Sequence, residues 1–341
     1  ANSDTQADDH FNTVLYTGDG TNTRSITGTG FLPDLVWIKS RTYTDSHSLT
    51  DSSRGVNKWL ISNTTAAETT NVNGAVNSFN SDGFTVSGNY DTNRDTKTFV
   101  AWNWKANGGT TSSNTDGTIT STVQANTDAG FSIVTYTGTG ANATVGHGLS
   151  SSPQMLITKD RDGTNSWFVQ TLTTGGSDYL LLNATNATAT DSTVWNSTSP
   201  SSTLFSLGSS SAGNQSTRKF IAYCFHSVEG YSKYGSYTGN GSADGTFVFT
   251  GFRPAFVMLK DIGGGEWGMF DSARNTFNVV NKLLQANVSD AEYSGDSNRD
   301  LDFLSNGFKL RNGSALVFNG SSRSLIYMAF AESPFKYANA R

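Results

Sequence analysis

Apolar residues in this chain occur as short runs or strict alternations that Gly, Asn and Asp interrupt, and no segment has the 3.6-residue period of a long amphipathic helix. The clearest alternations cover residues 98–105, 219–226 and 324–331. One face of each carries the bulky residues, which are Val100, Trp102, Trp104, Ile221, Tyr223, Phe225, Ile326, Met328 and Phe330. The pattern predicts an all-β fold in which these strands belong to β-sandwiches and turn their bulky side inward.

A pattern Y-T-G-x-G occurs three times, at residues 16–20, 136–140 and 237–241. Each copy is followed by a proline and an apolar run that ends in lysine, and we expect Lys39, Lys159 and Lys260 to mark where each strand reaches solvent. The repeat spacing of 120 and then 101 residues is too long for a solenoid and fits a duplicated domain. The chain is therefore predicted to hold three tandem, jelly-roll-like β-sandwich modules with a common ancestor.

The predicted modules cover residues 1–114, 130–235 and 236–341, and the middle one is the most diverged. Residues 115–129 are predicted to be a linker because they begin with a polar, glycine-containing stretch. The first and third modules also share a D-S-x-R element, at residues 51–54 and 271–274. If exposed, an Asp–Arg ion pair of this kind can brace a loop and contributes roughly 0–1 kcal/mol to the stability of the fold. The alternative is that Arg54 or Arg274 binds a carboxylated sugar.

Composition excludes several functions. A net charge of −5 without any basic block argues against nucleic-acid binding. The chain also lacks the roughly 20 consecutive apolar residues that a membrane helix needs, so we expect no membrane insertion. The single cysteine, Cys224, excludes an internal disulfide framework. Because it aligns with Asn103 and Ala329 in the other repeats, it is predicted to be a small packing residue.

Catalytic and metal-binding patterns are weak. Glycoside hydrolysis needs two acids roughly 5–10 Å apart, but the matched glutamates Glu68 and Glu292 fit capping or loop roles equally well. The four histidines fall at unmatched places, and no G-x-S-x-G elbow occurs. Residues 160–165 begin like a calcium loop but lack its terminal glutamate, which favours a turn. We therefore predict no catalytic residue, no metal site and no cofactor.

Aromatic residues offer the remaining candidate chemistry. Tyr43, His47, Trp167 and Trp267 fall at comparable places after the three proline strands, and the glycines beside Trp267 are expected to leave its ring accessible. An exposed flat ring can stack on the apolar face of a sugar, whereas a Trp beside a strand is also a common core or interface residue. The candidate ligand-binding residues are Tyr43, His47, Arg54, Trp167, Trp267 and Arg274.

The first repeat contains F-N-T-V-L-Y-T-G-D-G, G-F-L-P-D-L-V-W-I-K, S-D-G-F-T-V and F-V-A-W-N-W-K-A. These segments resemble a repeat found in virion proteins of marine bacteriophages, which are often labelled tail fibre or host-interaction proteins. The resemblance is close over residues 11–107, good over 236–341 and looser over 130–235. It implies a structural or adhesive role on the particle and supplies no catalytic residues.

Together these observations predict a non-enzymatic virion surface protein, extracellular, that acts as a tail fibre or spike-type component and contacts the host surface, in particular its glycans. The expected partners are other virion proteins, a host glycan or receptor, and further copies of the chain, with a trimer as the expected homo-oligomer because avidity multiplies weak sites. One alternative is a capsid-decorating or filament-forming protein whose loops make subunit contacts. Another is a polysaccharide depolymerase.

Overall fold

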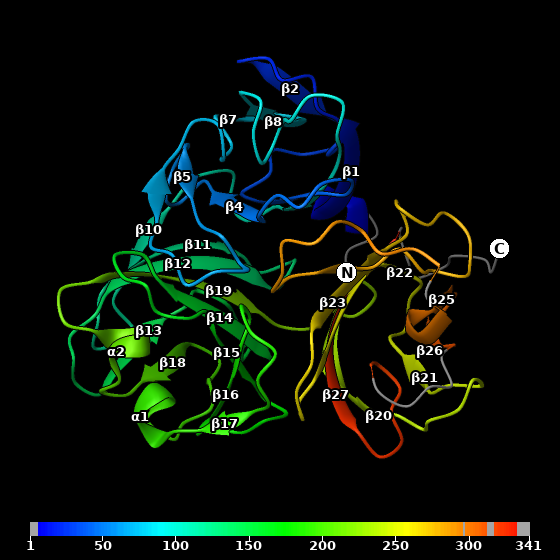
Figure 1. Cartoon of the computed structure of the whole chain (residues 1–341). Coiled ribbons are helices and arrows are strands. Elements are labelled where there is room, and N and C mark those ends of the chain that lie inside the picture. Colours follow the sequence, from blue (N-terminus) through cyan, green and yellow to red (C-terminus); the bar gives the residue numbers. More distant parts are fainter. Residues whose placement is uncertain (1–5, 296, 312–316, 333–341) are drawn as a thin grey trace.

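The structure is a computed structural model that describes residues 6–295, 297–311 and 317–332. It confirms the all-β prediction, since strands in several antiparallel sheets make up nearly all the regular structure. Figure 1 shows the chain as three lobes around a common centre: residues 6–111 form the first lobe, 112–229 the second and 230–332 the third. In the described ranges no helix is long and apolar enough to cross a membrane.

The first lobe contains a short 3-10 helix, Ala7–Asp9, and nine strands. The strands are β1 (Phe11–Thr17), β2 (Arg24–Thr27), β3 (Leu35–Ser40), β4 (Ser48–Asp51), β5 (Lys58–Trp59), β6 (Thr69–Thr70), β7 (Ser78–Asn80), β8 (Gly83–Val86) and β9 (Thr98–Trp104).

The second lobe adds two four-residue helices, α1 (Ser192–Trp195) and α2 (Ser211–Asn214), whose N-termini are capped by Asp191 and Ser210. Its strands are β10 (Ser112–Asn114), β11 (Ser121–Asn126), β12 (Phe131–Thr137), β13 (Ala143–Gly146), β14 (Met155–Asp160), β15 (Phe168–Thr171), β16 (Asp178–Leu181), β17 (Ala189–Thr190), β18 (Leu204–Leu207) and β19 (Lys219–Phe225).

The third lobe has a 3-10 helix, Ser297–Arg299, and eight described strands. These are β20 (Ser232–Thr238), β21 (Phe247–Phe249), β22 (Pro254–Asp261), β23 (Trp267–Asp271), β24 (Leu284–Gln285), β25 (Leu301–Leu304), β26 (Gly307–Leu310) and β27 (Ser324–Ala331).

Strand order is the same in the main sheets of the three lobes. The orders are β1-β9-β3-β4 in the first lobe, β12-β19-β14-β15 in the second and β20-β27-β22-β23 in the third. Each lobe also has a smaller sheet, which is β2-β8-β7, β13-β18 or β21-β26-β25. The first lobe has a further two-stranded sheet, β5-β6. A main sheet and a smaller sheet in each lobe, with apolar side chains between them, fit the β-sandwich class.

The segment predicted to be a linker, residues 115–129, is instead part of a sheet. Residues 121–126 of this segment form β11, which pairs with β12; together with β10 on one side and β16 and β17 on the other, it gives the second lobe's main sheet eight strands. The polar stretch that suggested a linker ends at Ser121; beyond it polar residues alternate with Val123 and Ala125, and Val123 packs into the core of this lobe. A short alternation of this kind is typical of a half-buried strand.

The bulky faces of the three long strands do not point into the sandwiches, contrary to the prediction. Trp102, Tyr223 and Met328 belong to one large apolar cluster that extends across all three lobes. In the first two lobes it is the other face of the strand, with Phe99 and Phe220, that fills a separate core inside the sandwich. The bulky side chains meet at the centre of the molecule, where the main sheets of the three lobes face one another.

The three Y-T-G-x-G segments are structural. The hydroxyls of Tyr16, Tyr136 and Tyr237 donate to the carbonyls of Thr92, Gly213 and Phe318 over 2.7, 2.8 and 2.7 Å. A Cβ on the first glycine of each segment would lie 2.2 to 2.3 Å from a backbone carbonyl oxygen, and the second glycine has a positive φ of 65 to 77°. Each motif therefore links the end of β1, β12 or β20 to the segment that precedes the last strand of the same lobe.

The three lysines are buried, so the expectation that they mark solvent is wrong. The Lys159 ammonium donates to the carbonyls of Asp160, Gly163 and Thr65, the last of which belongs to the first lobe. The Lys260 ammonium likewise donates to Thr185 of the second lobe. Burial lowers the pKa of Lys39, Lys159 and Lys260 to about 8. All three lysines close loops, and Lys159 and Lys260 also link lobes.

Candidate functional site

Three of the candidate ligand-binding residues make matching contacts between lobes. The indole N–H of Trp167 donates to the Ile61 carbonyl of the first lobe, and that of Trp267 donates to the Leu181 carbonyl of the second lobe, both over 2.9 Å. In the first lobe, Nε2 of His47 lies 3.0 Å from the Gln285 carbonyl oxygen of the third lobe. Each lobe is thus joined to another by the same ring-to-carbonyl contact.

The protonation of His47 follows from its neighbours. Its Nδ1 accepts from the indole N–H of Trp37 over 2.8 Å, so Nε2 carries the hydrogen and donates to Gln285. Burial lowers the pKa of His47 well below its ordinary value, which keeps the ring neutral. The prediction that Trp267 is accessible is wrong: Trp267, Trp167 and His47 are all buried in the interfaces between lobes, where carbonyl groups of a neighbouring lobe pair with their ring nitrogens.

The two D-S-x-R elements lie in the interfaces between lobes, where they are buried and not exposed. Arg54 binds Asp51 in its own lobe and Glu68 at 3.0 Å, and Arg161 of the second lobe binds the same glutamate at 2.8 Å. The Tyr223 hydroxyl, also from the second lobe, donates to Asp51 over 2.7 Å. Burial raises the pKa of Glu68, but the two guanidinium groups outweigh it and leave that pKa lowered.

Arg274 repeats this arrangement between the third and first lobes. It binds Asp271 at 2.5 Å and Glu292 at 3.2 Å, while Arg41 of the first lobe binds Glu292 at 2.8 Å and the Trp102 indole donates to Asp271 over 3.0 Å. Because both guanidinium groups are buried among protein partners, they brace the assembly and are not presented to a carboxylated sugar.

The segment at 160–165 is a turn closed by protein donors. The Asp160 carboxylate accepts from the backbone N–H groups of Asp162 and Gly163, from the Asn165 amide and from Arg218, over 2.8 to 2.9 Å. These donors occupy the oxygens that a calcium ion would need. Across the ranges that the structure describes, no group of three His, Cys, Asp or Glu residues could hold a metal ion.

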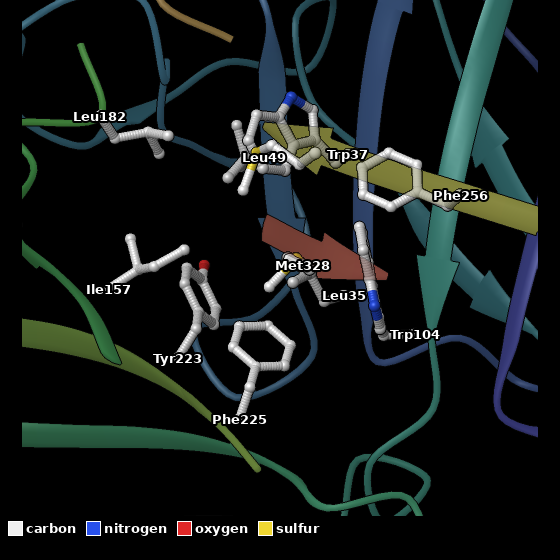
Figure 2. A pocket seen from close by; sticks show the side chains of 11 residues that line it. Leu35, Trp37, Leu49, Trp104, Ile157, Leu182, Tyr223, Phe225, Phe256 and Met328 are labelled. Carbon is white, nitrogen blue, oxygen red and sulfur yellow. The ribbon is translucent and has the colours of Figure 1, made fainter. Parts of the chain in front are cut away.

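The central cluster contains a small cavity. Figure 2 shows that side chains from the three lobes surround it, including Leu35, Trp104, Tyr223, Phe225 and Phe256. Its volume is about 20 Å³ and no polar atom contributes to its surface. A cavity this small and apolar has room for no sugar or cofactor, so it is a packing gap between the lobes.

The remaining candidate, Tyr43, lies in an exposed cluster on the first lobe. Its side chain is 43 % exposed, and Tyr90 beside it is 47 % exposed. The guanidinium carbon of Arg94 lies 4.4 Å from the centre of the Tyr43 ring and 5.8 Å from that of Tyr90, and the Lys97 ammonium lies 5.6 Å from the Tyr43 ring. Two accessible rings therefore flank cationic groups.

A pair of carboxyl groups supports this cluster from beneath. Arg94 binds the buried Asp45 through two N–H groups, over 2.6 and 3.1 Å, which fixes the plane of the guanidinium. Burial and the neighbouring Asp45, with which Asp91 shares a hydrogen bond, raise the pKa of Asp91 to about 7. Two acids in direct contact stand closer than the roughly 5–9.5 Å of a glycosidase pair. The pair therefore fits a positioning role better than glycoside hydrolysis.

The other lobes do not repeat this cluster. At the place of Lys97 they have Arg218 and Arg323, which bind Asp160 and Asp261. The first lobe has Ser40 where those aspartates stand, and in the described part of the chain Lys97 has no carboxylate partner. The Lys97 ammonium beside the exposed Tyr43 ring could therefore contact a ligand.

Sequence reasoning missed Asp45, Tyr90, Asp91, Arg94 and Lys97 because it compared positions that match between repeats. Those positions turned out to hold the fold together, whereas the exposed cluster consists of residues that differ between the lobes. One signal in the sequence could have found the cluster. Residues 89–97 of the first repeat include a tyrosine, an arginine and a lysine, whereas the matching residues 210–217 of the second repeat, which precede Arg218, include none of these residue types.

The fold and site define an all-β protein with three joined lobes and an exposed aromatic and cationic cluster on the first of them. The chain belongs to the family described as a domain of unknown function, DUF7483, whose model matches residues 6–334. No curated protein and no solved structure matches the chain.

Proposed function

We propose that this protein is a non-enzymatic virion surface protein, a tail fibre or spike-type component, and that it binds a host-surface glycan through Tyr43 and Tyr90. The observation that carries the proposal is the pair of accessible rings held beside Arg94 and Lys97. A pyranose can pack its C–H face on such a ring while its hydroxyls meet nearby donors. The resemblance to phage virion proteins supports the location at the particle surface.

We also infer that the three lobes are β-sandwich modules with a common ancestor. The shared strand order of the main sheets and the repeated tyrosine, lysine and ring contacts support this. A homo-oligomer, with a trimer as the expected form, would present several copies of the first lobe to a surface and so strengthen a weak site.

The test is an array of cell-surface oligosaccharides probed with the purified chain and the double variant Tyr43→Ala, Tyr90→Ala. The account predicts binding by the wild-type chain and a loss of at least about tenfold in affinity, roughly 1.4 kcal/mol, for the double variant. The control is Phe277→Ala, which removes an 80 % exposed ring from the third lobe and should leave binding unchanged. Equal binding by the double variant would remove Tyr43 and Tyr90 from the proposal.

A structural role is the second candidate, since the third lobe exposes apolar rings of Phe247, Phe249 and Phe277. Exposed apolar surface favours contacts with other subunits. A mass from light scattering, beside electron microscopy, separates the two functions. A closed oligomer fits the fibre or spike, whereas open polymers fit a filament-forming subunit.

A further inference from the structure

The smaller sheet of the third lobe has an unusual edge strand. In the order β21-β26-β25, β21 lies at the edge and places Val248 inside the lobe. The two flanking residues point outward, and Phe247 is 42 % and Phe249 59 % exposed. Edge strands normally carry charged or polar residues that discourage pairing with other chains. Here the edge instead carries two of the largest apolar side chains.

The backbone groups of this edge are also available. Leu310 donates to the Thr246 carbonyl and Thr250 donates to the Asn306 carbonyl, so Val248 and Phe308 form the hydrogen-bonded pair between them. Bonded and non-bonded pairs alternate in an antiparallel ladder. The N–H and C=O groups of Phe247 and Phe249 therefore point away from β26. Within the described ranges no residue pairs with them.

In the second lobe, the corresponding edge strand is covered by another segment of the chain. Its strand β13 occupies the place of β21, with Val145 inside the lobe as Val248 is. Ile119 lies along the outer side of β13 in a parallel bridge with Val145, and its N–H donates to the Thr144 carbonyl over 3.0 Å. The Ile119 side chain is buried in the core of the lobe. The chain thus adds its own extended segment to this edge.

The third lobe has no such segment before it, because β19 ends at Phe225 and β20 begins at Ser232. The first lobe offers a contrast, since Ser25 and Thr27 stand at the places of Phe247 and Phe249 and give that edge a polar surface. Only the edge in the third lobe combines free backbone groups with exposed rings among the residues described. Such an edge is suited to β-strand addition.

We propose that β21 binds an extended segment of a different protein, which pairs parallel to β21 and places an aliphatic side chain where Ile119 lies in the second lobe. The rings of Phe247 and Phe249 would then cover the outer face of the added strand. This interaction is separate from the proposed glycan site, which lies on the first lobe, so either proposal can fail alone.

The probe is a peptide with the sequence of residues 115–126, T-D-G-T-I-T-S-T-V-Q-A-N, which contains the segment that covers β13. It is titrated to millimolar concentration into the 15N-labelled full chain. The proposal predicts amide shifts at Phe247 and Phe249 and around Lys309 on the neighbouring strand. A peptide with Asp in place of its isoleucine should give no shifts, because its side chain cannot enter an apolar core. Shifts that are absent, or confined to other lobes, would overturn the proposal.

Two variants separate backbone pairing from simple apolar contact. Phe249→Pro removes the outward N–H that matches the Gly146 N–H, which faces Ile119 in the parallel bridge of the second lobe. An edge strand tolerates this change, and it should abolish the shifts at Phe247 and around Lys309. Phe249→Thr copies the first lobe, keeps the N–H and should weaken binding only a few-fold. Equal loss in both variants would refute strand addition. A dimer that Phe249→Pro disrupts would identify a second copy as the occupant and overturn the assignment to a different protein. If Phe249→Pro fails to fold, the two peptides still decide the question.

Discussion

The carboxyl pair beneath Tyr43 makes a quantitative prediction about stability. The pKa of Asp91 is raised from the ordinary 3.8 to about 7, chiefly by burial and then by Asp45. The folded protein therefore keeps a proton between pH 4 and 7 that the unfolded chain releases. Stability from this group is complete below about pH 4 and is lost as the pH rises to 7. A shift of roughly 3 pKa units at 1.36 kcal/mol each sets an upper limit of about 4 kcal/mol, which partial contact with solvent and the sharing of the proton with Asp45 reduce.

The variant Asp91→Asn copies the protonated carboxyl group, since its amide can donate to Asp45 and its oxygen can accept from the Ser46 N–H as Asp91 does. Its free energy of unfolding should therefore exceed that of the wild-type chain by an amount that grows from near zero at pH 4 to at most about 4 kcal/mol at pH 7, and stays constant above. Titrating groups other than Asp45, which shares the proton with Asp91, are common to both proteins and cancel from the difference.

The assay is guanidinium unfolding followed by tryptophan fluorescence, at pH values from 4 to 8, for the wild-type chain and for Asp91→Asn. Asp95→Asn, on the same loop but exposed, serves as the control and should change the difference little. A difference between Asp91→Asn and wild type that stays constant with pH would refute the shared proton, and with it the reasoning that Asp45 and Asp91 form a pair.

Three further predictions concern the contacts that join the chain. Gly138→Ala should cost about 2 kcal/mol or more, because its Cβ would lie 2.3 Å from the Gln215 carbonyl oxygen, whereas Gly213→Ala has space and should be neutral or stabilising in thermal unfolding. Tyr223→Phe should cost about 1–3 kcal/mol in chemical denaturation through the lost bond to Asp51. Tyr231→Phe should cost less, because in the described part of the structure its buried hydroxyl has no partner. The free energy of unfolding of the wild-type chain should rise between pH 8 and 10, because Lys159 in the unfolded chain keeps its proton there, whereas folded Lys159, with a pKa of about 8, has released it. Lys159→Met should remove this part of the rise. An unchanged pH profile in that variant would contradict the assignment.

The all-β class could be predicted because strand alternation is local and strong. The alternation at 98–105 even separated the two faces of β9 correctly. The alternation could not show which face of the strand belongs to which core. Trp102, on the bulky face, contacts Asp271, which is 169 positions away in the chain. Sequence periodicity indicates that one face of a strand is buried, but it does not identify the residues that pack against that face.

Repetition misled the search for a binding site. Trp167, Trp267 and Arg274 recur at matching places because each interface between lobes needs the same contacts, and burial in these interfaces removes them from solvent. Tyr43 was reached through the same comparison and is exposed, although the second lobe has Gly163 at the matching place. Residues that differ between lobes, such as Lys97, are free to serve a ligand because no shared contact constrains them.

The most direct test of the account is a crystal structure of the chain soaked with an oligosaccharide selected from the array. The account predicts a sugar ring stacked on Tyr43 or Tyr90, with Arg94 or Lys97 within hydrogen-bond distance of its oxygens. A sugar bound on another lobe, with Tyr43 and Tyr90 bare, would contradict it.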